Sequence, residues 1–267
     1  KNKKASSSFE VTGYISDNIY YDTMFISAED FELNVSIDNN EKYLIERLFR
    51  KDIFDVSGFA SKDGLEFTGG KFNLANYLKF TEPKHKSKSG IPVSVNLDTL
   101  NITDSFYIDN FSTRFVSDSI NGTFAGLFMG AEPVTGSFGS ENGYRFAEIL
   151  SNDAGAFLQA AGLIKRGAEG KLNLRINRNA DGIKGRLFTE SLKIYDLPAL
   201  AKLLQSLSII GLLEQMLGQG LFLAESEINF RLDDKQYIID RASFFGPSLG
   251  ISPVSYTHLT LPTISCV

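Results

Sequence analysis

Residues Asp196–Ser252 read DLPALAKLLQSLSIIGLLEQMLGQGLFLAESEINFRLDDKQYIIDRASFFGPSLGIS and combine a long apolar segment with two alternating segments. In the first alternating segment, Phe222, Ala224, Ser226, Ile228, Phe230 and Leu232 share one face, opposite Glu225, Glu227, Asn229 and Arg231. A period of two is the mark of a β-strand with one apolar and one polar face. This stretch therefore predicts a helix, a glycine hinge, two strands, and a turn at Gly246–Gly250.

The same alternation recurs along the rest of the chain. Leu172, Leu174 and Ile176 share one face of a predicted strand, and Val93–Leu97 alternates in the same way. Turn-forming residues separate such runs at Lys62-Asp63-Gly64, Asn121-Gly122, Glu141-Asn142-Gly143, Asp181-Gly182 and Asp233-Asp234. We expect a mainly β protein built from antiparallel hairpins and meanders rather than from βαβ units.

Three helices are predicted among these strands. Glu41–Phe49 is a short amphipathic candidate, and Asp153–Ala161 is introduced by Ser151-Asn152 and followed by Gly162. The third candidate is Leu197–Leu217, with Asp196 as N-cap and glycines after its end. Its apolar stripe contains Leu200, Leu203, Leu204, Leu207 and Leu213. Because polar residues interrupt this stripe, we interpret the segment as a cap on a β-surface rather than a membrane span.

The two ends of the chain are set apart from the fold. VSYTHLTLPTI, at 254–264, resembles the translation of a sequencing-library adapter, so we exclude residues 254–267 from fold reasoning. The only cysteine, Cys266, and one of the two histidines, His258, lie in this tail. The chain opens at Lys1 without a methionine, so we expect it to be a fragment of a longer protein.

Composition excludes one function class and leaves others open. A net charge of −5 argues against a nucleic-acid-binding protein, which would carry a basic field. The high phenylalanine content, 22 residues, favours strands. A hydrophobic fraction of 43% with 22% charged residues is ordinary for a globular chain.

No catalytic or metal-binding constellation can be assembled from the residues. Gly246-Pro247-Ser248-Leu249-Gly250 matches the G-x-S-x-G pattern of hydrolases, but Pro253 follows closely and disfavours the helix that such a serine needs. His85 lies between lysines in a polar loop, and zinc-type ligand spacing is missing. We therefore expect no enzyme, no cofactor and no metal, and we interpret Gly246–Gly250 as a turn between strands.

The order of these features resembles the AsmA-like proteins of Gram-negative bacteria, in particular the YhdP-like branch. The resemblance is carried by SNDAGAFLQAAGL, GKLNLRI, the Asp-x-Pro helix start, the Gly-x-Gly after that helix, and GPSLGIS, and it covers about 92–252. It implies an elongated, twisted β-groove with a hydrophobic floor, in a periplasmic protein held by an N-terminal inner-membrane anchor that this fragment lacks. It also implies phospholipid transport between the two membranes and a role in outer-membrane integrity.

On this reading the chain has three parts: a β-rich segment at 1–91, a truncated AsmA-like C-terminal-type region at 92–253, and the tail at 254–267. An apolar sheet face needs cover, and an uncovered one is a binding surface or an aggregation hazard. Acyl chains would provide that cover. The predicted groove residues are Leu172, Leu174, Ile176, Phe222, Ile228 and Phe230.

Two alternatives to a lipid-binding groove stay open. The six groove residues could be ordinary sheet core beneath the helix of 197–217. The whole chain could also be a structural or adhesive β-solenoid from a surface protein, which would show regular short repeats and internally stacked apolar residues.

Overall fold

The structure is a computed structural model that describes residues 8–15, 19–38, 42–80, 90–118, 121–141, 144–179, 182–196, 220–233, 236–247, 249–251 and 257–258. These residues are mainly in β-strands, as the alternation predicts. The chain divides into two compact units, Lys1–Gly130 (unit 1) and Ala131–Val267 (unit 2). The domain boundary expected between residues 91 and 92 falls inside unit 1, between its helix and the strand that follows.

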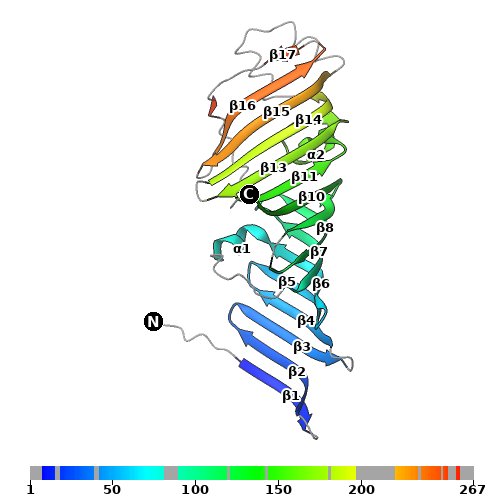
Figure 1. The fold of residues 1–267 in the computed structure, drawn as a ribbon, viewed down its shortest axis with the longest axis vertical. Coiled ribbons are helices and arrows are strands. Elements are labelled where there is room, and N and C mark those ends of the chain that lie inside the picture. The colour runs from blue at the N-terminus through cyan, green and yellow to red at the C-terminus, as the bar shows by residue number, and fades with distance from the viewer. Residues whose placement is uncertain are drawn as a thin grey trace. The chain divides into compact units, whose positions relative to one another are not determined.

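Unit 1 is a sheet in which each strand pairs with the next along the chain (Figure 1). Its strands are β1 (Ser8–Ile15), β2 (Ile19–Ala28), β3 (Phe31–Asp38), β4 (Lys42–Arg50), β5 (Phe54–Ser61), β6 (Gly64–Asn73), β7 (Pro92–Asn101), β8 (Tyr107–Val116) and β9 (Gly122–Phe128). All of these pairings are antiparallel except β6 with β7, which are parallel and are separated in sequence by helix α1 (Leu74–Phe80).

Unit 2 shows the same style of pairing among its own strands. Its strands are β10 (Glu132–Glu141), β11 (Tyr144–Ser151), β12 (Arg166–Ala168), β13 (Lys171–Asn179), β14 (Gly182–Asp196), β15 (Leu221–Asp233), β16 (Gln236–Gly246), β17 (Leu249–Ile251) and β18 (Thr257–His258). The main ladder runs β10, β11, β13, β14, β15, β16 and β17, all antiparallel. The short strand β12 pairs with the end of β14, and β18 pairs with β16.

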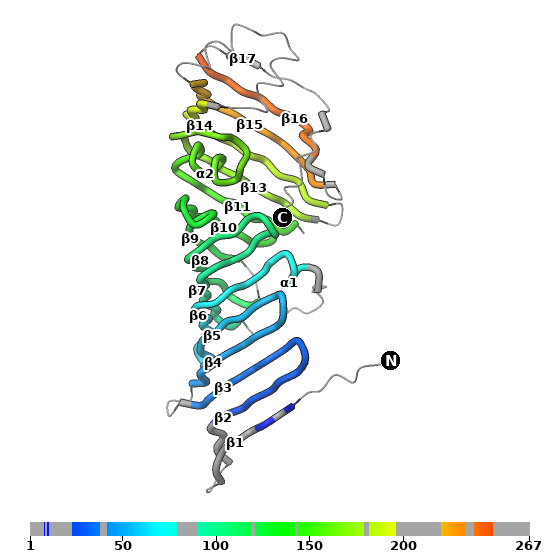
Figure 2. The backbone as a smooth tube through the Cα atoms, turned by 180° about the vertical axis from the view of Figure 1, so that it is seen from behind, coloured from blue at the N-terminus to red at the C-terminus, as the bar shows by residue number. Residues whose placement is uncertain are grey.

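Helix α2 (Ala154–Ala160) follows β11 and lies against β10, β12 and β14, over one face of the strands (Figure 2). Asp153 is its N-cap, and the Asp153 side chain accepts a 2.8 Å hydrogen bond from the backbone N–H of Ala156. The helix buries Ala154, Gly155, Phe157 and Leu158. The helix predicted at Asp153–Ala161 is therefore confirmed, but its N-cap is Asp153, which was predicted to lie within the helix.

The helix predicted at Glu41–Phe49 is wrong, because this segment is strand β4. A β-bulge between Ile45 and Leu48 inserts residues into the strand, so the inward apolar positions are spaced by two and then by three. That mixed spacing imitates the periodicity of a short amphipathic helix.

The expectation of hairpins without βαβ units holds for every described pairing except one. The parallel pair β6–β7 with α1 between them is a βαβ unit, where an antiparallel hairpin was expected. Asn73, directly before α1, was the sequence signal for this helix, because asparagine is a preferred N-cap residue. In the structure the Asn73 side chain accepts a 2.9 Å hydrogen bond from the N–H of Asn76, which is the interaction of a helix N-cap.

Several turn predictions are confirmed by the pairings on either side of them. The turn at Lys62-Asp63 joins β5 to β6, and Gly246 pairs with Leu249 across the predicted Gly246–Gly250 turn. In the tail, which the sequence analysis set aside, Thr257 and His258 form β18 opposite Ile239 and Ile238.

Other predictions fall outside the described residues. These are the helix at 197–217 with Leu200, Leu203, Leu204, Leu207 and Leu213, and also His85, Ser248 and Cys266.

Candidate functional site

The most distinctive surface of unit 2 is one face of its sheet, where apolar residues from five adjacent strands stand directly opposite one another. Residues paired across antiparallel strands lie on the same face, so the register defines rows of neighbouring side chains. The central row consists of Ile149, Leu174, Leu187, Ile228 and Ala242. The next row, which we call the glycine row, consists of Ala147, Ile176, Gly185, Phe230 and Ile239.

A third row borders the central row on its other side. It consists of Ser151, Leu172, Thr189, Ser226 and Phe244, and we call it the hydroxyl row. The three rows together make up what we call the unit 2 apolar face. Every strand contributes to each row because its side chains alternate between the two faces of the sheet.

Five of the six predicted groove residues lie on this face, where the register brings them together. Leu172 is only 2% exposed, whereas Leu174, Ile176, Ile228 and Phe230 are partly exposed. Burial is therefore highest in the hydroxyl row and lower in the central and glycine rows.

Phe222, the sixth predicted residue, stands apart from the other five. It lies near the start of β15, opposite Lys193, and is 40% exposed. The register thus separates it by several residues from the central row.

The glycine row takes its shape from a contact between an aromatic ring and a residue without a side chain. A Cβ atom placed on Gly185 would lie 2.2 Å from Cζ of Phe230 and 2.6 Å from two further ring carbons. The ring of Phe230 therefore rests on the backbone of the neighbouring strand, where only glycine leaves room for it.

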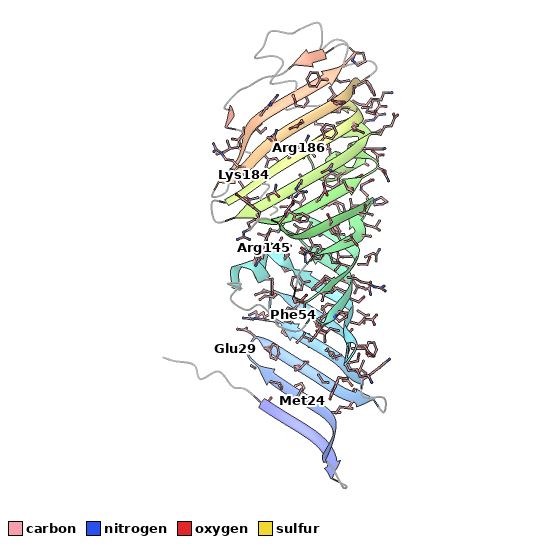
Figure 3. The ribbon with its side chains drawn as sticks, in the orientation of Figure 1. Met24, Glu29, Phe54, Arg145, Lys184 and Arg186 are labelled. Carbon is pink, nitrogen blue, oxygen red and sulfur yellow. The ribbon has the colours of Figure 1, made fainter. Side chains whose placement is uncertain are left out.

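The opposite face of the same strands carries the charged side chains, together with apolar residues such as Phe146, Leu150 and Phe188. The row on that face next to the central row consists of Glu148, Arg175, Arg186, Asn229 and Arg241. Figure 3 labels Arg186 and Lys184, which alternate with Gly185 and Leu187 along β14. The backbone of the sheet thus separates the apolar central row from this charged row.

The charges on the polar face are held by specific partners. Arg186 donates a 3.0 Å hydrogen bond to Glu227 and lies over the ring of Phe188, with 5.3 Å between Cζ and the ring centroid. The hydrogen bonds from Arg186 and Asn229 lower the pKa of Glu227 to about 2, so this carboxylate stays charged in ordinary buffers. Arg175 makes a similar pair with Glu141 at 3.0 Å and lies over Phe146.

Unit 1 carries the same two-faced pattern on its own strands. One of its apolar rows consists of Met24, Val35, Ile45, Gly58, Phe67, Val95, Thr113 and Phe124. Val35, Ile45 and Phe124 in this row are buried. A second row consists of Ile26, Leu33, Leu48 and Val56. None of these residues was predicted as a site residue, although the alternation of Phe31, Leu33, Val35 and Ile37 was a signal for them.

The polar face of unit 1 repeats the arginine arrangement. The Arg47 guanidinium donates two 2.9 Å hydrogen bonds to the carboxylate of Asp55 and one of 3.2 Å to Glu32. The hydrogen bonds from Arg47 lower the pKa of Asp55. Arg47 also lies over the ring of Phe49, 4.7 Å from its centroid.

These apolar faces can bury apolar atoms of a ligand. Over the described ranges, no group of three or more His, Cys, Asp or Glu residues is placed to hold a metal ion. Within the same ranges, the helices are too short or too polar to pass through a bilayer. Apolar atoms on a partly exposed face gain roughly 25 cal/mol for each square ångström that a ligand removes from water.

Comparison of the chain with family models, with curated proteins and with solved structures found no match.

Proposed function

We propose that this chain is part of a non-enzymatic protein of the Gram-negative cell envelope whose apolar sheet faces hold the acyl chains of phospholipids. The observation that carries the proposal is the central row of unit 2, where apolar side chains from β11, β13, β14, β15 and β16 stand side by side. Leu174, Leu187 and Ile228 of this row remain partly exposed.

Acyl chains are the ligands that such a surface suits best. Burial of a methylene group gains about 0.8 kcal/mol and needs no directed contact, so a row of aliphatic side chains holds a chain without fixing its chemistry. The opposite face, with its paired arginines and carboxylates, stays hydrated. A single sheet could therefore expose one face to lipid and the other to water.

The finer architecture belongs to the same proposal. The apolar faces would form the floor of an elongated, twisted groove, with the segment 197–217 as a cap that includes Leu200 and Leu213. The full-length protein would be anchored in the inner membrane and project into the periplasm, and its groove would guide phospholipid toward the outer membrane. The resemblance to AsmA-like proteins supports this part of the proposal.

The pairing pattern also bears on the alternative of an adhesive β-solenoid. Apolar residues stacked inside a closed coil would be shielded on all sides. Here the consecutive described strands of unit 2 form antiparallel ladders, and several residues on the apolar side are partly exposed. This arrangement favours a ligand-binding surface rather than a structural β-solenoid.

The proposal is tested by the lipid that the purified protein retains. Ile228→Glu places a carboxylate in the central row, and we expect the folded variant to lose most of its co-purifying phospholipid, measured by extraction and native mass spectrometry. Asn229→Glu is the matched control, because it adds the same charge one residue along β15, between Arg186 and Arg241 on the polar face. Equal phospholipid in both variants, or none in the wild type, would refute the proposal.

A further inference from the structure

The hydroxyl row contains three polar side chains, and two of them, Thr189 and Ser226, lie between apolar neighbours. Thr189 and Ser226 stand directly opposite each other on β14 and β15, between Leu172 and Phe244. They are 2% and 5% exposed, and neither hydroxyl oxygen has a hydrogen-bond partner among the residues that the structure describes.

Buried hydroxyl groups in proteins are nearly always hydrogen-bonded, because an unpaired one loses its bonds to water without replacement. Two other buried hydroxyls, those of Thr113 and Ser151, follow that rule. Thr113 donates to the backbone oxygen of Thr123 at 2.7 Å, and Ser151 donates to Glu132 at 2.6 Å. Two adjacent exceptions at one place on the apolar face require a partner outside the described residues, and a bound molecule would supply one.

We propose that Thr189 and Ser226 donate hydrogen bonds to the carbonyl oxygen of an acyl chain that lies on the unit 2 apolar face. This inference rests on the proposed function and goes beyond it, because it fixes where the polar end of the chain lies. A carbonyl oxygen has two lone pairs and accepts from two hydroxyl groups, and each hydroxyl has one proton to donate.

The length of the face fits this arrangement. From Thr189 the apolar side of β14 continues through Leu187 and Gly185 to Ile183, which is six residues along the strand. At about 3.3 Å per residue this distance is about 20 Å. One acyl chain spans one leaflet, or about half of the ~30 Å hydrocarbon core of a bilayer, so the face is long enough to hold it.

Only one end of the row, at Phe244, is partly exposed. Phe244 stands opposite Ser226 and is partly exposed, whereas Leu172, on the side of Thr189, is buried. Because Thr189 and Ser226 are themselves buried, a carbonyl group would reach the two hydroxyls only if the ring of Phe244 moved aside. The hydrocarbon chain would then extend over Leu187 and Ile228.

The test is isotope-edited infrared spectroscopy of the protein loaded with phosphatidylethanolamine or with palmitate, each carrying a ¹³C-labelled carbonyl group. In the Thr189→Val/Ser226→Ala variant we expect the carbonyl band to move to higher frequency. The affinity should fall roughly tenfold, as the loss of two neutral hydrogen bonds implies. Thr189→Ser keeps a hydroxyl and should retain the wild-type band. Thr135→Val, at an exposed position of β10, is the control for an unrelated site.

The outcomes separate this inference from the function on which it rests. A wild-type protein that binds neither probe would overturn both. If Ile228→Glu removes the lipid while the hydroxyl variant keeps the wild-type band and affinity and unfolds at a higher temperature, only the inference fails. A band shift with palmitate alone assigns the carbonyl to a free fatty acid, and a shift with phosphatidylethanolamine assigns it to a phospholipid ester. If the double variant does not fold, Ser226→Ala alone is read in the same way.

Discussion

At the scale of single residues, the fit between Gly185 and Phe230 shapes the apolar face. We expect Gly185→Ala to destabilise the fold by roughly 1–3 kcal/mol, because the new methyl group would overlap the ring carbons. Urea unfolding measures this change. In a Phe230→Ala background the same substitution should cost much less, so a double-mutant cycle isolates the contact. Equal costs in both backgrounds would show that the ring does not rest on Gly185.

A second residue-scale prediction concerns the ion pair of Glu227 with Arg186. The folded pKa of about 2 lies below the ordinary value of 4.5, so the pair contributes stability above about pH 4.5 that is lost as the pH falls toward 2. Both side chains are substantially exposed, so this contribution is at most about 1 kcal/mol. In an Arg186→Gln variant, the NMR titration midpoint of the Glu227 carboxylate should rise toward 4.5. An unchanged midpoint would mean that Arg186 does not lower the pKa of Glu227.

The faces of individual residues could be predicted from the sequence, but their neighbours could not. Alternation alone placed Leu174, Ile176 and Ile228 on apolar faces. It could not show that Leu174 meets Leu187 or that Phe230 covers Gly185, because these contacts depend on strand register. The separation of Phe222 from the other predicted residues follows from the same register.

At the scale of elements, the capped helix α2 was predictable and β4 was not. The Asp153 cap is a local signal that depends on few residues. The bulge in β4 distorts the period on which the prediction relied. The parallel pairing of β6 with β7 is a long-range arrangement, and α1 between them is only seven residues long.

The cap of α2 provides an element-scale prediction. Asp153→Ala removes the acceptor for the N–H of Ala156 and should lower the free energy of unfolding by about 0.5–2 kcal/mol. The neighbouring exposed Asn152→Ala is the control and should change it by less than about 0.5 kcal/mol. Chemical denaturation followed by circular dichroism compares the two. If both variants lose the same stability, the cap does not hold the helix.

At the scale of the whole molecule, composition and alternation predict the mainly β class, because both are averages over many residues. The sequence placed every groove residue in unit 2, although unit 1 has apolar rows of the same kind. The lipid-carrying function stays a proposal, because apolar rows also serve as ordinary cores.

The two-faced pattern of unit 1 leads to a prediction for the entire chain. We expect Leu33→Glu, in a partly exposed position of the unit 1 apolar rows, to reduce the phospholipid retained per molecule. Ser36→Glu, on the other face of β3, should leave it unchanged. Quantitative lipid extraction checks both variants. Full retention in the Leu33→Glu variant would confine lipid binding to unit 2.

We propose that one face of the sheet holds lipid and the other does not. Photo-cross-linking along β15 distinguishes the two faces. A photoreactive amino acid is placed in turn at positions 227 to 232 in cells, and phospholipid adducts are detected by mass spectrometry. We expect adducts from Ile228, Phe230 and Leu232 and none from Glu227, Asn229 and Arg231. Adducts at every position, at the polar positions alone, or at none would contradict the proposal.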